Sequence, residues 1–303
     1  MAIILDGKVV AKAIKNWLSS SVSMIEKRYG WTPSFVTVQV GNDPASDRYI
    51  RNQIKLCREL GMNAELIQFP SDISKDDFMK RIKEIENDDN VDGIIIQRPL
   101  PEGWTIDEII RSVSPVKDVE GIHPENLGCL FLGQESIPHP CTAWAAILLL
   151  EWYGRDSFEG TRCAVVGRSP NVGRAAALMM MHRHATISVC HTRTSDNSLK
   201  DILKDSEIVI TAAGVADIVD QHDLRPDAWV VDVGMNVTDD GRLVGDVTPL
   251  EEPLVAAISL VPGGVGPVTV ALLMANLLLC ATKRRLGKGL ALPNLKKLRE
   301  TVE

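Results

Sequence analysis

The sequence lacks the features that mark zinc proteins and nucleic-acid binders. Its six cysteines stand at positions 57, 129, 141, 163, 190 and 280, without a Cys-x-x-Cys pair or a zinc-type spacing to histidine. We therefore expect no metal site. The 33 lysines and arginines are outnumbered by 40 aspartates and glutamates, which gives a net charge of −7. That balance argues against a general nucleic-acid partner, because such binding rests largely on neutralising phosphates.

Long uninterrupted apolar runs are also absent. The apolar stretch behind the first methionine is too short for the core of a signal peptide. Residues 253–282 carry no charge, but prolines and glycines between 262 and 267 interrupt them. The remaining 267–282 is shorter than the ~20 residues that a membrane span needs. We expect a buried helix there, no membrane partner, and a cytoplasmic protein with buried, reduced thiols; Cys141, in Pro-Cys-Thr, is the thiol that could line a site.

Alternating strand and helix patterns predict an α/β protein of two domains, and 303 residues agree with that number. Strand–helix–strand succession implies parallel sheets with right-handed connections. The expected first domain is 1–140 together with 268–303, and the second, Rossmann-type domain is 141–267. The expected strands are 3–5, 34–40, 63–69, 91–97, 163–166, 185–190, 207–211 and 229–233. The expected helices are 7–29, 46–60, 75–87, 106–112, 142–153, 172–182, 199–204 and 267–282, with 113–140 irregular.

One turn has the character of a dinucleotide-binding loop. Residues 163–173, Cys-Ala-Val-Val-Gly-Arg-Ser-Pro-Asn-Val-Gly, run from an apolar strand into an alanine-rich helix. Gly167 and Gly173 flank the turn, and backbone N–H groups at such a helix start can hold a pyrophosphate. The alternative is a glycine-rich turn that binds nothing.

The end of the next strand favours NADP over NAD. NAD sites usually place an acidic residue there for the ribose 2′-hydroxyl, whereas this strand ends Cys-His-Thr-Arg-Thr at 190–194. Arg193 and Arg168 could instead pair with a 2′-phosphate, because a guanidinium suits that group. Each arginine could also be a solvated surface charge.

Six segments stand out along the chain, in the order SDRYIRNQIK (46–55), IIIQRPLP (94–101), KDVEG (117–121), PCT (140–142), GRSPNVG (167–173) and VPGGVGPVT (261–269). Together they resemble the methylenetetrahydrofolate dehydrogenase/cyclohydrolase family over nearly the whole chain. The resemblance implies oxidation of 5,10-methylenetetrahydrofolate by hydride transfer to NADP, then hydrolysis of the methenyl product, in one-carbon metabolism. It also implies a homodimer, and a cleft between an N-terminal catalytic domain and a Rossmann-type NADP domain.

The same resemblance implies roles for particular residues. Tyr49 would line the folate site and stack on the substrate ring, and Gln97 would hydrogen-bond near the reacting centre. The alternatives are a partly buried helix residue and a strand-end hydrogen bond. The other positions that match the family are the dinucleotide loop Gly167, Arg168, Ser169 and Gly173; Thr192 near the 2′-phosphate; Met235 beside the cofactor; and the loop Pro262, Gly263, Gly264, Val265 and Gly266, which would touch both ligands.

Two positions of the implied folate site depart from the family pattern. Gln53 stands where the family's Tyr-x-x-x-Lys motif has lysine, on the helix face that Tyr49 shares. Lys55 lies roughly 600° around the helix from Tyr49, on the opposite face, and cannot substitute. Glutamine cannot act as a general base, so cyclohydrolase activity is expected to be weak or lost. Glu120 replaces the aspartate that in the family binds the pterin ring. Its carboxylate therefore lies one methylene farther from the backbone.

These departures leave three possible functions. The first is an active NADP-dependent dehydrogenase with little cyclohydrolase activity. The second is a degenerate paralogue that binds folate or nucleotide without useful turnover. The third is a dehydrogenase for another small substrate. Hydride transfer needs positioning more than a base, which favours the first.

Overall fold

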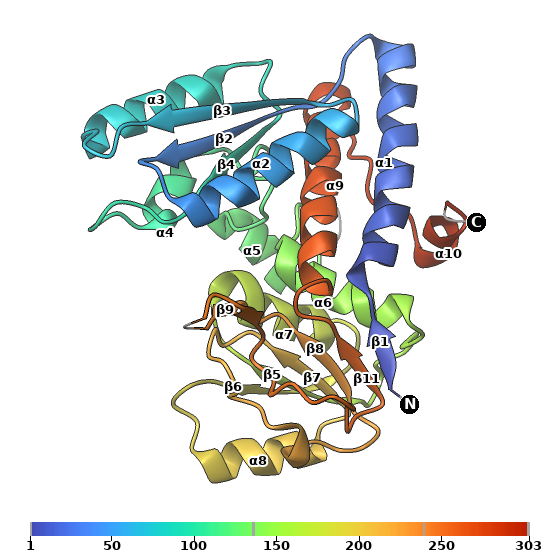
Figure 1. The fold of residues 1–303 in the computed structure, drawn as a ribbon. Coiled ribbons are helices and arrows are strands. Elements are labelled where there is room, and N and C mark those ends of the chain that lie inside the picture. The colour runs from blue at the N-terminus through green and yellow to red at the C-terminus, as the bar shows by residue number, and fades with distance from the viewer. Residues whose placement is uncertain (1, 135–136, 239, 302–303) are drawn as a thin grey trace. The chain divides into compact units, whose positions relative to one another are not determined.

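In the computed structural model, described for residues 2–134, 137–238 and 240–301, the chain divides into two compact α/β units (Figure 1). Unit 1 joins Met1–Lys12 to Pro140–Leu272, and unit 2 joins Ala13–His139 to Leu273–Glu303. Both sheets that form the cores are parallel, so the predicted α/β class with two domains is confirmed.

Unit 2 is built on a three-stranded sheet in the order β3-β2-β4. Val36 and Val38 of β2 face Phe78 and Ile82 of α3, so the alternate residues of the strand point to the other side, toward α2. The elements of unit 2 are β2 (Ser34–Val40), α2 (Pro44–Glu59), β3 (Asn63–Phe69), α3 (Lys75–Asn87), β4 (Gly93–Ile96), α4 (Ile106–Ile109), a 3₁₀ turn (Ile110–Ser112), α5 (Pro124–Phe131) and α10 (Leu295–Arg299), with most of α1 (Gly7–Tyr29) and of α9 (Val265–Leu286).

Helix α2 begins two residues earlier than the sequence pattern predicted. Asp43 caps its N-terminus, because the carboxylate accepts a hydrogen bond from the Ser46 N–H at 2.8 Å. Pro44 follows in the first turn, where its missing N–H costs nothing. Asp43 and Pro44 therefore define the N-terminus of α2.

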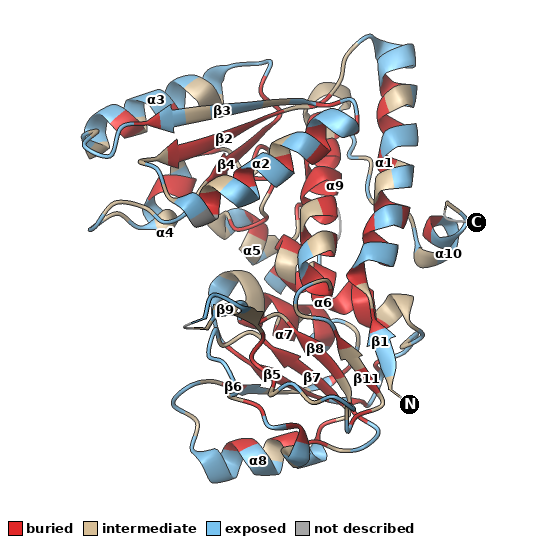
Figure 2. Cartoon of the chain, viewed as in Figure 1, coloured by how far each residue is buried: buried red, intermediate tan, exposed pale blue. Residues whose placement is uncertain are grey.

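Helix α9 is long and apolar enough to cross a membrane, but 78% of its most apolar 18-residue stretch is buried within the protein (Figure 2). It therefore serves as a core helix, as expected, although it extends over 22 residues rather than ending at 282. A Cβ on Gly93 would lie 2.8 Å from Leu277 Cδ1 and 2.4 Å from Val119 Cγ1. Glycine at the start of β4 thus lets α9 and the 117–121 segment approach this strand.

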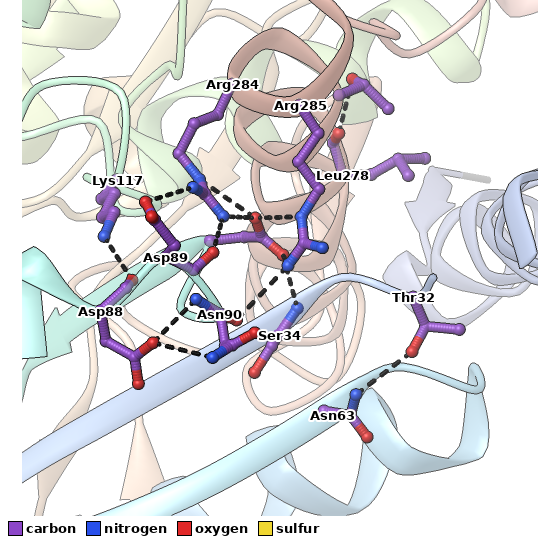
Figure 3. Close-up of polar contacts among 12 residues, drawn as sticks. Thr32, Ser34, Asn63, Asp88, Asp89, Asn90, Lys117, Leu278, Arg284 and Arg285 are labelled. Carbon is purple, nitrogen blue, oxygen red and sulfur yellow. Dashed lines mark hydrogen bonds and ion pairs between the residues drawn. The ribbon is translucent and has the colours of Figure 1, made fainter. Parts of the chain in front are cut away.

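A buried carboxylate joins the end of α9 to the start of β4, and Figure 3 labels its partners Ser34, Arg284 and Arg285. Asp92 is fully buried, and its oxygens accept hydrogen bonds from Arg285 Nε and Nη2 at 2.8 Å and from the Ser34 N–H at 3.1 Å. Arg284 Nε donates to the same carboxylate at 3.2 Å. Burying this charge is tolerable only because two guanidinium groups and a backbone donor satisfy it.

Unit 1 is built on a six-stranded sheet in the order β1-β11-β8-β7-β5-β6. Helices α6 and α7 cover one face and α8 the other (Figure 1). The elements are β1 (Ile3–Leu5), α6 (Cys141–Trp152), β5 (Arg162–Val166), a π-helical turn (Pro170–Arg174), α7 (Ala175–Met181), β6 (Thr186–Cys190), α8 (Asp196–Asp205), β7 (Ile208–Thr211), a 3₁₀ turn (Gln221–Asp223), β8 (Trp229–Asp232), the short pair β9 (Asn236–Val237) and β10 (Leu243–Val244), and β11 (Ala257–Ser259).

Two parts of this arrangement differ from the sequence-based predictions. Strand β1 pairs with β11 in the sheet of unit 1, so Met1–Lys12 belongs to unit 1 and not with Ala13–His139. Within 113–140, predicted to be irregular, α5 forms because Pro124 occupies its first turn and His123 caps it, accepting the Glu125 N–H at 3.1 Å. None of the six cysteines, which all lie in the described ranges, forms a disulfide; five are buried, Cys141 among them, and Cys129 is half-buried.

Candidate functional site

The carboxyl end of β4 is joined to the start of α2. The Gln97 N–H donates to the Val38 carbonyl at 2.8 Å and continues the sheet past the last residue of β4. The next carbonyl, that of Arg98, accepts hydrogen bonds from Gln97 Nε2 at 3.0 Å and from the Ser46 hydroxyl at 2.7 Å. The Gln97 amide is thereby held at the strand end, on the same loop that anchors α2.

The two predicted site residues of α2 differ in exposure. Tyr49 is 38% exposed, whereas Gln53, one turn later, is only 2% exposed. The Lys55 side chain is 75% exposed and its Nζ lies 3.8 Å from Glu59 Oε1. The structure confirms that Lys55 points away from the side of α2 on which Gln53 lies, so it cannot take the place of a base at position 53.

Three buried oxygen atoms on β2 and α2 have no hydrogen-bond donor among the described residues. They are Thr37 Oγ1, Gln39 Oε1 and Gln53 Oε1. Thr37 and Gln39 alternate on the face of β2 toward α2, and Gln39 Nε2 donates to Asp47 Oδ1 of α2 at 2.9 Å. Buried acceptors usually have a donor from protein, water or ligand. This side of α2 is therefore suited to hold a donor that the described residues do not supply.

Residues 117–121 bring Glu120 alongside the end of β4. The Ile94 N–H donates to the Lys117 carbonyl at 2.8 Å, and Ile94 forms a parallel bridge with Asp118. Asp118 is fully buried and its oxygens accept the N–H groups of Gly121 at 3.0 Å and His123 at 2.7 Å. Asp118 thus fixes the turn, and the neighbouring acid, Glu120, is left to project from it.

Glu120 forms an ion pair with the residue that follows Gln97. Its Oε1 lies 3.5 Å from Arg98 Nη2, and the two side chains are 22% and 51% exposed. Burial raises the pKa of Glu120 to about 7, Arg98 opposes that rise, and the Asp118 charge adds to it. Near neutral pH this carboxyl group is therefore close to its titration point.

In unit 1 the sheet reverses its strand order at β5, with β6 on one side and β7 on the other. Ligands of such sheets bind beyond the carboxyl ends of the strands at this point. Gly167 follows β5 with a φ of +142°, and a Cβ there would lie 2.2 Å from the Ala212 carbonyl oxygen. A Cβ on Gly173 would lie 2.2 Å from the Gly167 carbonyl oxygen. Both glycines are required for the tight passage from strand to helix.

Ser169 completes this turn by capping the helix that follows, because its hydroxyl accepts the Gly173 N–H at 3.5 Å. Helix starts that follow such turns are common binding sites for phosphate groups. The glycines and the serine cap therefore form a tight strand-to-helix turn, and its role as a nucleotide loop stays a prediction.

The predicted 2′-phosphate residues lie on the two neighbouring strand ends. Val166 of β5 pairs with Cys190 of β6, and the Gly167 N–H donates to the Cys190 carbonyl at 2.8 Å. Arg168 therefore follows one strand and Thr192 and Arg193 follow the other, and all three are exposed. This edge can present two guanidinium groups to an anion.

Two aspartates at the same edge were missed by the sequence analysis. Asp232, at the end of β8, accepts the N–H groups of Gly234 at 2.9 Å, Asp246 at 3.0 Å and Val247 at 2.9 Å. Asp246 in turn binds the loop after β7, accepting from the N–H groups of Ala213, Gly214 and Val215. The one sequence signal for Asp232 was an acidic residue at the end of the apolar strand Trp-Val-Val-Asp. No sequence signal pointed to Asp246.

The remaining predicted residues of unit 1 flank this edge. Met235, three residues after β8, is 69% exposed. The segment Pro262–Gly266 ends in the first two residues of α9, and it is joined to α1 because the Gly7 N–H donates to the Gly263 carbonyl at 3.0 Å. A Cβ on Gly7 would lie 1.7 Å from the Gly264 carbonyl oxygen, so the glycines let the two segments meet. Unit 2 therefore carries Tyr49, Gln53, Gln97 and Glu120, and unit 1 carries all the others.

Comparison with known proteins assigns both parts of the chain. Residues 5–120 match the family model described as the tetrahydrofolate dehydrogenase/cyclohydrolase catalytic domain. Residues 140–285 match the NAD(P)-binding domain of the same family. The bifunctional protein FolD of Chloroflexus aurantiacus is 40% identical over 285 residues, which are 94% of this chain and 98% of that protein.

Solved structures agree with this assignment. A bifunctional FolD methylenetetrahydrofolate dehydrogenase/cyclohydrolase from Campylobacter jejuni superposes with a TM-score of 0.89 at 35% identity, covering 94% of this chain and all of that one. The Trypanosoma brucei enzyme, solved with NADP and an inhibitor, gives 0.87 at 32% identity, covering 94% and 98%. These matches show that the chain belongs to the tetrahydrofolate dehydrogenase/cyclohydrolase family.

Proposed function

We propose that this protein oxidises 5,10-methylenetetrahydrofolate to 5,10-methenyltetrahydrofolate with NADP, and that it hydrolyses the methenyl product weakly or not at all. Membership of the family supports the first part. The buried amide of Gln53, one turn from Tyr49 on α2, carries the second part.

The nucleotide loop fits NADP, which when bound supplies the hydride acceptor. Backbone N–H groups at the start of the helix after Ser169 would hold its pyrophosphate. Arg168 and Arg193, on adjacent strand ends, would pair with the 2′-phosphate, since charge-assisted contacts to phosphate are among the stronger hydrogen bonds. The strand end at 190–194 offers no carboxylate for an unmodified ribose, which favours NADP over NAD.

The residues of unit 2 would hold the folate. Tyr49 offers an aromatic face for stacking, and the Gln97 amide offers a hydrogen bond at the end of β4. The carboxylate of Glu120 would accept hydrogen bonds from the amino-pterin edge. For hydride transfer these groups only have to orient the substrate. None of them has to gain or lose a proton.

Hydrolysis of the methenyl product differs in that water must give up a proton. The amide of Gln53 cannot accept it at any ordinary pH. Gln53 can still hold a water, because its Oε1 is buried and has no donor from the described part of the chain. Loss of general-base catalysis typically slows a reaction by ~10²–10⁴-fold, so the methenyl compound should accumulate.

A two-signal assay tests the proposal. Methylenetetrahydrofolate and NADP are mixed with the protein, and the absorbance of NADPH and of the methenyl product is followed in one cuvette. The proposal requires NADPH to form and the methenyl signal to rise with it. Binding of NADP and folate without any NADPH would instead identify a degenerate paralogue. Turnover of other small alcohols or amines but not of the folate would identify a different dehydrogenase.

The proposal also covers the compartment, the oligomeric state and the partners of the enzyme. It would act in the cytoplasm as a homodimer on tetrahydrofolate one-carbon substrates, without a nucleic-acid or membrane partner. The net charge of −7 and the burial of α9 within the protein support the last two points. Sedimentation of the purified protein at micromolar concentration tests the dimer.

A further inference from the structure

Arg98 is a charged residue at the folate side of unit 2 that has no role in the proposed reaction. Its backbone carbonyl is fixed by Ser46 and Gln97, which ties the residue to the site. Its side chain is half-exposed and extends to Glu120, with Nη2 3.5 Å from Oε1. The Arg98 guanidinium is thus the cationic partner of Glu120, the residue proposed to bind the pterin ring.

We infer that Arg98 is a positioning residue that holds the Glu120 side chain in place for recognition of the pterin ring. This inference rests on the proposed function, since it assumes that Glu120 binds folate. The glutamate arm has one more rotatable bond than an aspartate, and a fixed partner reduces the conformational entropy that the arm loses when substrate binds. Ser46 and Gln97 hold the backbone of Arg98, so the partner itself is well placed.

The charge of Arg98 matters as much as its position. Two charged groups act on Glu120: Arg98, which favours the ionised carboxylate, and buried Asp118, which opposes it. Burial raises the pKa of Glu120 to about 7, so the carboxylate is only partly ionised at neutral pH even with Arg98 present. The ionised form accepts two hydrogen bonds from an amino-pterin edge, whereas the protonated form would place an O–H against a donor. Folate binding should therefore strengthen as pH rises through about 7.

Removing the guanidinium separates this role from a structural one. In Arg98→Leu the pKa of Glu120 rises further, because an opposite charge at such a distance favours ionisation. The KM for methylenetetrahydrofolate should rise about 3- to 10-fold at pH 7. It should rise by a smaller factor at pH 9, where the carboxylate is ionised in both proteins and only the positioning is lost. The KM for NADP should not change, and kcat should change little. Arg98→Lys, which keeps a positive charge, should recover most of the loss.

Arg111→Leu provides the matched control, since Arg111 is an exposed arginine of the same unit outside the site. It should leave both KM values and their pH dependence unaltered. An Arg98→Leu protein with the wild-type pH profile would overturn the inference. So would a loss of equal size at pH 7 and pH 9 that Arg98→Lys does not recover, because that result indicates a damaged loop and not a lost partner for Glu120.

A binding experiment distinguishes failure of this inference from failure of the proposed function. Tetrahydrofolate is titrated into the wild-type protein and Arg98→Leu without NADP, and tryptophan fluorescence reports binding at pH 6, 7 and 9. If the wild type lacks turnover but its binding shows the Arg98-dependent pH effect, the inference stands and the proposed reaction fails. If the wild type turns over and the two proteins bind alike at every pH, the inference fails alone. If the wild type does not bind tetrahydrofolate, both fail.

Discussion

The Ser46 hydroxyl of α2 lies 2.7 Å from the Arg98 carbonyl oxygen at the end of β4. This contact joins the helix that carries Tyr49 and Gln53 to the loop that carries Gln97. A buried serine with a fixed partner near the N-terminus of α2 gives the helix a defined rotation. Substitutions further along α2 should therefore not rotate the helix. The effect of a variant at residue 53 can then be attributed to the changed side chain.

Arg193 is predicted to discriminate between the two nicotinamide cofactors. Charge-assisted hydrogen bonds contribute ~1.5–3 kcal/mol, and exposure reduces that, so Arg193→Ala should raise the KM for NADP about tenfold. The KM for NAD should stay nearly unchanged, because NAD has no 2′-phosphate. Steady-state kinetics with both cofactors measure this. Arg162→Ala is the control, because Arg162 is an exposed arginine at the opposite end of β5, paired with Asp205. An equal effect of Arg193→Ala on both cofactors would refute the NADP assignment.

Gly173 is predicted to be indispensable to the nucleotide loop. Gly173→Ala would place a methyl group 2.2 Å from the Gly167 carbonyl oxygen, so the turn must open. The free energy of unfolding should fall by about 1–3 kcal/mol and the KM for NADP should rise. Urea denaturation and initial rates report the two effects.

Gly128 of α5 provides the comparison, since a Cβ there has no atom within 4 Å outside its own helix and chain neighbours. Gly128→Ala should be neutral or stabilise the protein by up to about 1 kcal/mol, because alanine favours a helix. If the two alanine variants lose stability alike, the tight turn at Gly173 is not the cause.

Asp92 is predicted to be the most sensitive charged residue for stability. Asp92→Ala leaves Arg284 and Arg285 half-buried without their carboxylate, and breaking a buried ion pair typically costs about 3–5 kcal/mol. The urea midpoint should fall accordingly. Lys80→Ala, which removes an exposed ion pair with Asp77, should change stability by no more than about 0.5 kcal/mol. A loss of under 1 kcal/mol in Asp92→Ala would mean that the arginines find other partners.

The parts of the fold that sequence analysis predicted are those that local patterns determine. The period of α2 placed Gln53 with Tyr49 and turned Lys55 away, as the structure has it. Helix α5 was missed, because Gly128 lies in its middle and its cap is His123 in place of the usual serine, threonine or aspartate.

Contacts between segments far apart in the chain could not be predicted from the sequence. Strand β1 has its partner β11 more than 250 residues away, and nothing in Ile-Ile-Leu identifies that partner. The pairing of Arg98 with Glu120 depends on the 117–121 segment running beside β4, which a bridge between Ile94 and Asp118 establishes. The buried network of Asp232 and Asp246 likewise joins loops that follow different strands.

The fate of the methenyl product in Gln53→Lys tests the account most directly. Position 53 is only 2% exposed, so a lysine there would be desolvated, and its lowered pKa would favour the neutral amine that can accept a proton. Cyclohydrolase activity should rise by ~10²–10⁴-fold while dehydrogenase activity changes little. The double variant Gln53→Lys with Glu120→Asp shows whether the pterin site must also be restored, since neighbouring residues need not act additively.

Lys55→Gln, on the exposed side of the same helix, should affect neither activity. The decisive measurement is the ratio of methenyl hydrolysis to NADPH formation, followed together in wild type and Gln53→Lys. We expect the wild type to accumulate methenyltetrahydrofolate and the variant to consume it. A wild type that hydrolyses the methenyl compound as fast as the variant would contradict the account and require another base.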